Sequence, residues 1–301
     1  MGYLFAFVAV FLWSFNYIIA ASFADSLQPF EIALGRWLIA SVILIPWAKN
    51  EIIACRKMLW QKRWLVLGLS LTGMVLCNTL IYYAGRTSTP LNMSLLGLTG
   101  PVFIVVLSAI FLKGKISFVQ ILGFIIALTG VVIVITNGNL PMSGSIRFVS
   151  GDWWMLLNAF CFAVYTILQS RRPKEVSQRA MLAITAAVGT VIIFPAAWIE
   201  NGGLPLNSLS LEDIEVFLYL GIMNSVLAYL AWNTALDKIG NIRTGVIYYS
   251  LPLFSGVEAY LIMGEKVFPA QAWGGLLVIM GIACVSFAGK IRKLNGLTVK
   301  K

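Results

Sequence analysis

The chain contains no histidine among its 301 residues. Histidine is the commonest general base and metal ligand, so its absence argues against an intramembrane enzyme and against a metal site. Phosphate-binding loops of the form GxxxxGK[ST] and zinc motifs of the form HExxH are also missing. We therefore predict no catalytic residues, no cofactor and no built-in ATPase, and any uphill process must draw on an ion or substrate gradient.

Cysteine and charge are scarce as well. The four cysteines form no CxxC pair and three of them lie in apolar runs, so we expect core residues and no disulfide framework. Charged residues make up 11% of the chain, against about 25% in ordinary soluble domains. The net charge of +10 invites a nucleic-acid interpretation, but its distribution is better explained by membrane topology, and no nucleic-acid partner is expected.

Apolar runs of about 20 residues recur along the whole chain, and 59% of its residues are hydrophobic. Such runs are long enough to cross a bilayer as helices, since lipid offers the backbone no hydrogen-bond partner. The sequence therefore predicts an all-α integral membrane protein with ten transmembrane helices. The predicted spans are Tyr3–Ala21, Phe30–Trp47, Trp64–Ala84, Asn92–Leu112, Ser117–Thr136, Trp153–Ser170, Arg179–Trp198, Ile214–Leu236, Arg243–Met263 and Gln271–Ala288.

Basic residues alternate sharply between the predicted loops. With the N-terminus inside, 18 Lys and Arg residues fall in inner loops and the C-terminal tail, and three fall in outer loops. Cytoplasmic loops carry such an excess, so the split places both termini in the cytoplasm. The basic tail is expected to touch anionic membrane lipid.

The chain repeats itself. An offset of 151 residues superposes Pro101 on Pro252, Gly123 on Gly274 and Gly130 on Gly281, which indicates internal duplication. In the first two spans of each half the offset is 149. Five spans are an odd number, so the second half enters the membrane from the opposite face. We predict two inverted five-helix repeats, residues 1–136 and 153–289, joined by an external loop at 137–152 and followed by a basic cytoplasmic tail at 290–301. This architecture is typical of secondary transporters.

Arg36 and Glu258 are the only charges deep within predicted spans. They are expected at similar depth on the same side, where they either pair or share one water-filled cavity. A charge at such depth costs a few kcal/mol, about 3, unless it faces a partner or water. The pair would then be a gate or an anchor for a zwitterionic substrate, or else a static contact between helices.

Polar and aromatic residues at mid-span form a second set of candidates. As a set they favour a cavity lining, whereas any single asparagine is better explained by a hydrogen bond between helices. Pro101 and Pro252 are predicted to kink their helices, and the freed carbonyls would meet substrate or merely permit packing. Recurring glycines favour close helix packing, with a homodimer face as one option. The predicted cavity residues are Trp13, Asn16, Arg36, Asn78, Tyr82, Asn158, Tyr165, Tyr229, Tyr248, Tyr249 and Glu258.

Several segments resemble the drug/metabolite transporter superfamily, in its EamA-like branch. They are WSFNY at 13–17, the stretch from Pro29 to Arg36, LPLFSG at 251–256 and MGEK at 263–266. The resemblance covers nearly the whole chain and implies a central cavity and secondary transport, often export, of small metabolites such as amino acids. It also implies that the chain lies in the plasma membrane, as the bacterial inner membrane. The chain departs from the family pattern at LKGK, residues 112–115, so Glu265 has no acidic counterpart in the first repeat.

The leading functional prediction is a secondary transporter that exports amino acids or related small metabolites by alternating access. Efflux of hydrophobic cationic drugs is the alternative, since aromatic walls and a carboxylate bind cations. An intramembrane enzyme is a remote alternative. The partners expected are a small-molecule substrate and membrane lipid, with a homodimer as a possibility.

Overall fold

Every regular element in the described part of the chain is helical. The structure is a computed structural model and describes residues 1–23, 26–88, 93, 96–112, 117–136, 149–206, 209–254 and 269–298. The elements are α1 (Gly2–Ser14), α2 (Asn16–Ser22), α3 (Pro29–Gln61), α4 (Arg63–Leu69), the π-helix η1 (Ser70–Leu76), α5 (Cys77–Gly85), α7 (Thr99–Leu112), α8 (Phe118–Thr136), α9 (Ser150–Gln169), α10 (Gln178–Asn201), α11 (Leu211–Tyr219), the π-helix η2 (Leu220–Leu227), α12 (Ala228–Ile239), α13 (Asn241–Ile247), the 3₁₀ turn η3 (Tyr248–Ser250) and α15 (Pro269–Thr298).

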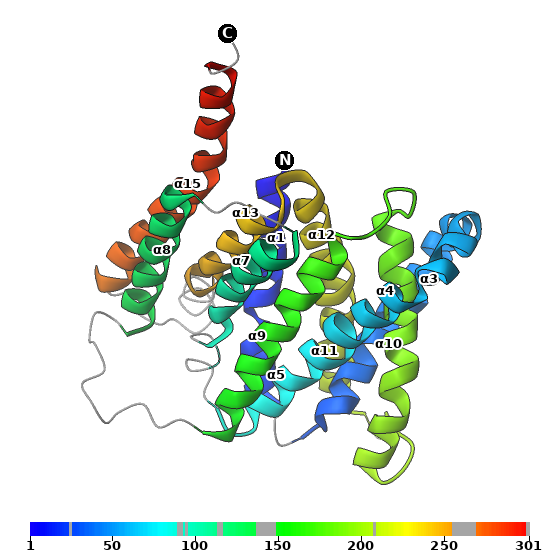
Figure 1. The fold of residues 1–301 in the computed structure, drawn as a ribbon. Helices are drawn as coiled ribbons and strands as arrows, with labels where there is room; N and C mark the ends of the chain where they lie inside the picture. Colours follow the sequence, from blue (N-terminus) through cyan, green and yellow to red (C-terminus); the bar gives the residue numbers. More distant parts are fainter. Residues whose placement is uncertain are drawn as a thin grey trace.

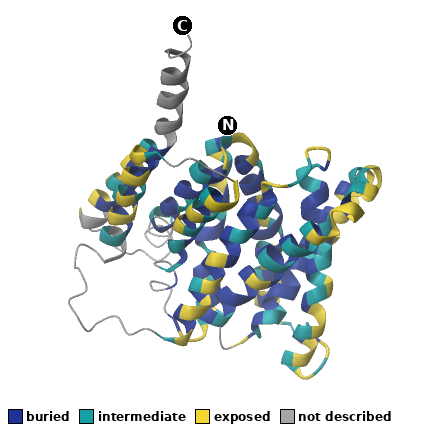
Figure 2. Cartoon of the chain, in the orientation of Figure 1, coloured by how far each residue is buried: buried dark blue, intermediate teal, exposed yellow. Residues whose placement is uncertain are grey.

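Six continuous helical stretches are long and apolar enough to cross a membrane: Gly2–Ser22, Pro29–Gln61, Arg63–Gly85, Ser150–Gln169, Gln178–Asn201 and Leu211–Ile239. Shorter apolar helices cover Thr99–Leu112, Phe118–Ile133 and Ala272–Val285. Large apolar side chains remain exposed on the outer faces of α3, α10 and α15, for example Val42, Val191 and Ile279 (Figure 2). Those faces suit contact with lipid. The predicted all-α class is confirmed, and the count of ten spans stays a prediction.

The helices pack in pairs that join the two halves of the chain (Figure 1). Helix α1 packs on α12, α5 on α9, α3 on α10 and α8 on α15. The α8–α15 pair lies at one side of the bundle, and the N-terminus lies at the same end as the C-terminal end of α15 (Figure 1). Every one of these contacts thus joins an element from before residue 137 to one from after residue 148.

Tight glycine contacts hold α8 against α15. A Cβ atom placed on Gly281 would lie 2.5 Å from the carbonyl oxygen of Gly123, and one on Gly130 would lie 2.5 Å from that of Gly274. Because the 151-residue offset maps Gly123 onto Gly274 and Gly130 onto Gly281, the two contacts exchange under it. The glycines of the repeat therefore serve packing within one chain, and the homodimer stays a prediction.

At each end of the contact between α3 and α10, a glutamate of one helix accepts a hydrogen bond from the other helix. Glu51, in the second half of α3, accepts a hydrogen bond from the guanidinium of Arg179 at the start of α10. At the other end, Glu200 accepts hydrogen bonds from the backbone N–H of Phe30 at 2.8 Å and the hydroxyl of Tyr83 at 2.5 Å. An offset of 149 relates Glu51 to Glu200 and Phe30 to Arg179, so the two ends use equivalent positions.

The prolines expected to kink helices lie near breaks in regular structure. Pro101 is the third residue of α7. N–H groups in the first turn have no partner within the helix, so the proline removes no helical hydrogen bond. Pro252 lies in a helical segment at residues 251–254 that directly follows η3. Neither proline lies in the middle of an uninterrupted described helix.

Candidate functional site

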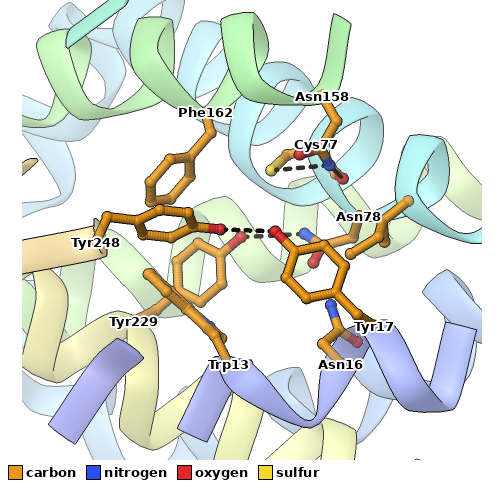
Figure 3. Close-up of a pocket in the computed structure, with 10 residues that line it drawn as sticks. Trp13, Asn16, Tyr17, Cys77, Asn78, Asn158, Phe162, Tyr229 and Tyr248 are labelled. Atoms are coloured by element: carbon orange, nitrogen blue, oxygen red, sulfur yellow. Dashed lines mark hydrogen bonds between the residues drawn. The ribbon is translucent and has the colours of Figure 1, made fainter. Parts of the chain in front are cut away.

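A small cavity lies where α1, α2, α5, α9, α12 and η3 meet (Figure 3). Its volume is about 40 Å³, enough for a few water molecules and no more. Aromatic rings and neutral polar side chains form its wall, and no charged side chain is among the described lining residues. Those residues are Trp13, Asn16, Tyr17, Cys77, Asn78, Ile81, Asn158, Phe162, Tyr229 and Tyr248.

The two π-helices place much of this wall. A π turn leaves backbone carbonyls without their usual α-helical partner and is often found at functional sites. In η1 the carbonyl of Gly73 accepts hydrogen bonds from the Tyr229 hydroxyl at 2.8 Å and the Asn78 amide at 2.6 Å. The same amide lies 3.1 Å from the Tyr229 hydroxyl. Asn78 and Tyr229 are thereby fixed to each other and to the carbonyl of Gly73.

The second π-helix, η2, likewise fixes Trp13 through a backbone carbonyl. The indole N–H of Trp13 donates to the carbonyl of Asn224 in η2 at 3.0 Å, and the Asn224 amide donates to the carbonyl of Leu12 at 2.9 Å. Gly73 and Asn224 differ by 151 residues, the offset of the sequence repeat. Helix α1 is therefore held to η2 by two reciprocal bonds at the point where it gives way to α2.

Aromatic rings surround Trp13 closely. Its ring centroid lies 5.3 Å from those of Phe162, Tyr229 and Trp232. Across the cavity the hydroxyls of Tyr17 and Tyr248 lie 3.2 Å apart, and Figure 3 shows them meeting between the two walls. Edge-on and tilted contacts of this kind stabilise a rigid aromatic wall. Such a wall binds apolar groups through area and cations through ring faces.

Asn158 completes the polar side of the cavity. It comes from α9, and its amide donates to the backbone carbonyl of Cys77, the first residue of α5 after η1. The thiol of Cys77 lies 3.7 Å from the same amide nitrogen. One side chain thus joins α9 to the exit of the π-helix.

Arg36 lies one layer behind the wall and is fully buried. Its Nε donates to the hydroxyl of Ser225 at 2.8 Å, and its Nη1 donates to the hydroxyl of Tyr82 at 2.9 Å. The Tyr82 hydroxyl donates in turn to the side-chain carbonyl of Asn16, 3.4 Å away, which lines the cavity. Nη2 has no hydrogen-bond partner, and no carboxylate lies within 4 Å of this cation, among the described residues. A chain of two hydrogen bonds, through Tyr82 and Asn16, therefore connects the buried guanidinium to the cavity wall.

The remaining sequence candidates lie elsewhere. Tyr165 packs behind Phe162 and Tyr229, and its hydroxyl bonds the side chain of Asn233 at 3.0 Å. Tyr249 packs edge-on against Phe124 with ring centroids 6.1 Å apart. Glu258 lies outside the described residues, so its pairing with Arg36 stays a prediction.

The sequence candidates Trp13, Asn16, Asn78, Asn158, Tyr229 and Tyr248 meet at this cavity, although they come from distant parts of the chain. Four lining residues were not among the sequence candidates: Tyr17, Cys77, Ile81 and Phe162. The repeat contains a signal for Phe162, because an offset of 149 maps Trp13 onto it. The arrangement has the groups for binding a small molecule by stacking and hydrogen bonding.

A family model described as the EamA-like transporter family matches residues 1–136 and 149–287 of the chain. Among curated proteins, an uncharacterized transporter of Archaeoglobus fulgidus is 28% identical over 284 residues, which cover 91% of this chain and 93% of that protein. A probable terminal-alkyne amino-acid exporter of Streptantibioticus cattleyicolor is 27% identical over 221 residues, which cover 71% and 70%.

A solved crystal structure shares the fold, with a TM-score of 0.72 over 96% of this chain and 97% of that one, at 20% identity. Its likeness extends over nearly the full length of both chains. The two ranges matched by the family model leave out residues 137–148, which fall in the loop that the sequence predicts between its two repeats.

Proposed function

This chain belongs to the EamA-like transporter family, and we propose that it is a secondary transporter that exports amino acids or related small metabolites. It is a multi-pass membrane protein. The observation that carries the proposed substrate is the aromatic cavity with a buried arginine one layer behind it. An amino acid has an apolar or aromatic side chain for the rings and a carboxylate that the positive charge would favour.

The link from Arg36 to the cavity supports a carboxylate ligand in particular. Arg36 donates to the Tyr82 hydroxyl through its Nη1, and Tyr82 donates to the side-chain carbonyl of Asn16, which makes the Asn16 amide N–H the group that would meet an anion in the cavity. Electrostatic attraction acts over several ångströms in a site that excludes water, because the effective dielectric there is low. A related protein named as a probable amino-acid exporter agrees with this substrate class.

The proposed mechanism is alternating access between two inverted repeats of five helices each, with both termini in the cytoplasm. It is supported by the glycine contacts of α8 with α15, which exchange under the repeat offset, and by the equivalent glutamates at the two ends of the α3–α10 pair. The cavity of about 40 Å³ is too small for an amino acid, so this structure would be a closed state in the proposed cycle. Substrate would enter when contacts at one end open.

Efflux of hydrophobic cations is the second candidate. The ring faces of Trp13, Tyr229 and Tyr248 favour it, since cations bind aromatic faces. Arg36 opposes it, because a positive charge one layer away repels a cation in a medium of low dielectric.

Transport by the purified full-length protein in proteoliposomes tests the proposal. Labelled amino acids would be offered with and without a pH gradient, to the wild type and to Glu258→Gln. Glu215→Gln, which alters an exposed carboxylate on α11, is the matched control. We expect saturable amino-acid flux in the wild type and the control. Accumulation that needs the gradient and Glu258 would assign proton coupling to that residue.

Flux that ignores the gradient and survives Glu258→Gln would mean facilitated diffusion with a structural Glu258. Absence of flux for every amino acid, together with flux of a hydrophobic cation, would replace the first candidate by the second.

A further inference from the structure

A second cavity lies on the outside of the bundle, between the end of α3, the start of α4 and the face of α10. Its volume is about 450 Å³, far larger than that of the central cavity. Two arginines stand among apolar and aromatic side chains in its wall. The lining residues are Ile52, Arg56, Leu59, Trp60, Arg63, Trp64, Val66, Leu67, Ile184 and Val188, and we call this cavity the α3–α4 groove.

The two cations of the α3–α4 groove have no ion-pair partner in the part of the chain that the structure describes. Neither Arg56 nor Arg63 forms an ion pair within the described residues, where the two ion pairs are Arg172 with Asp237 and Arg179 with Glu51. Arg63 lies over two indole rings, 5.8 Å from the centroid of Trp60 and 5.7 Å from that of Trp64. The guanidinium is thereby held at the rim by its ring contacts while its N–H groups stay available.

The position of the groove relative to a bilayer follows from helix length. Helix α3 has 33 residues and is about 50 Å long at about 1.5 Å per residue, which exceeds a hydrocarbon core of about 30 Å. Its apolar part comes first and fills the hydrocarbon core, so the turns after Trp47 lie at and beyond the boundary with the headgroups. The next membrane-length stretch starts at Arg63, which returns the chain to that boundary. Trp60 and Trp64 are 73% and 72% exposed, as tryptophans at that boundary are. The groove thus has an apolar wall on α10 and a cationic, indole-lined rim at headgroup level.

We propose that the α3–α4 groove binds one anionic phospholipid from the adjacent leaflet. The phosphate lies between Arg56 and Arg63, whose positive charges no ion pair of the described residues balances. An acyl chain lies along the apolar wall that Leu59, Ile184 and Val188 contribute. Basic pockets between membrane helices are typical sites for anionic headgroups. A second copy of this chain fits less well, because it would bury two unpaired arginines at the contact.

Native mass spectrometry of the delipidated full-length protein tests the proposal. The probes are dioleoylphosphatidylglycerol and dioleoylphosphatidylcholine, which share acyl chains and differ in headgroup charge. The test variant is Arg56→Gln with Arg63→Gln. The control is Lys49→Gln with Lys57→Gln, which removes the same charge from exposed residues of α3 that do not line the groove.

We expect the wild type and the control to retain one phosphatidylglycerol in preference to phosphatidylcholine. The arginine variant should bind phosphatidylglycerol about 30-fold more weakly, which equals about 2 kcal/mol at about 1 kcal/mol per arginine. Should that variant aggregate, Arg63→Gln alone should show a loss of about fivefold. Equal binding of the two lipids by the wild type, or an equal loss in the lysine control, would overturn the proposal. Neither result depends on transport, so it stands or falls separately from the proposed function.

Discussion

The substitution Gly73→Ala tests whether the π-helix η1 and the aromatic layer behind the cavity are packed as one unit. A methyl group on Gly73 would lie 2.6 Å from Cε2 of Tyr165 and closer still to its Cδ2. Ordinary contact begins at 3.4 Å, so the ring must withdraw by at least about 0.8 Å. Tyr165 is 1% exposed and tied to Asn233, so it has no free direction to move.

Inserting one methylene-sized group into a well-packed core typically costs about 1–3 kcal/mol, and we expect a cost in this range. The displaced ring touches Phe162 and Tyr229, which both line the cavity. Gly73→Ala should therefore lower the thermal unfolding midpoint in detergent by several degrees and raise the KM for transport. Gly100→Ala is the matched control, because its methyl would meet Ala159 at an ordinary 3.9 Å within a helix.

A double-mutant cycle isolates the contact. Tyr165→Leu removes the ring that the methyl meets, so Gly73→Ala should cost less in that background than in the wild type. The thermal midpoints of the four proteins give the coupling free energy. Strictly additive effects, or a Gly73→Ala protein as stable as the Gly100→Ala control, would refute the packing described here.

Three further predictions concern helix contacts and the charge behind the cavity. Gly281→Ala should lower the unfolding midpoint more than Gly100→Ala, at unchanged KM, because its methyl would meet backbone atoms of α8 at 2.5 Å; equal midpoints in a thermal scan would contradict this. Arg36→Lys keeps the positive charge but loses the guanidinium that bonds both Ser225 and Tyr82. Proteoliposome assays should then show roughly tenfold weaker transport of carboxylate substrates. Unaltered transport would show that Arg36 takes no part in substrate binding. Trp13→Phe loses one hydrogen bond to η2, so stability should fall by about 1 kcal/mol or less in chemical unfolding; a loss above about 3 kcal/mol would show that the ring, not the bond, dominates.

Much of the helical framework could be predicted because lipid forces apolar runs into helices. The apolar stretch at Phe30–Trp47 predicts a membrane span, and the structure has a helix there. The helix, however, continues to Gln61. The residues after Trp47 are polar, so hydropathy predicts a loop there. Many of them are Glu, Lys, Arg, Met or Leu, which are strong helix formers outside the membrane as well. Hydropathy thus gives the length that lipid requires and not the length of the helix.

The candidate site could be predicted in its membership more than in its geometry. Mid-span asparagines such as Asn16, Asn78 and Asn158 are costly in lipid. The sequence alone therefore predicts that their side chains face the interior of the bundle and not the lipid. The layer of each residue depends on rotamers and helix rotation, so the place of Arg36 behind Tyr82 could not be predicted. The π-helices have no periodic signal in the sequence, because one wide turn changes the apolar pattern by a single position.

The two π-helices also bear on how the transporter would move. Asn78 and Tyr229 each lie two residues beyond the end of a π-helix. Relaxation of one wide turn to the α form, by one residue, rotates the downstream part of the helix by about 100° and shifts it by about 1.5 Å. Deuterium exchange at the η1 amides, with and without substrate, would detect that change, and identical exchange would exclude it. Such a shift would rotate Asn78 or Tyr229 out of the cavity while the surrounding helices keep their positions. The polar lining of the cavity would then change without a movement of the whole bundle.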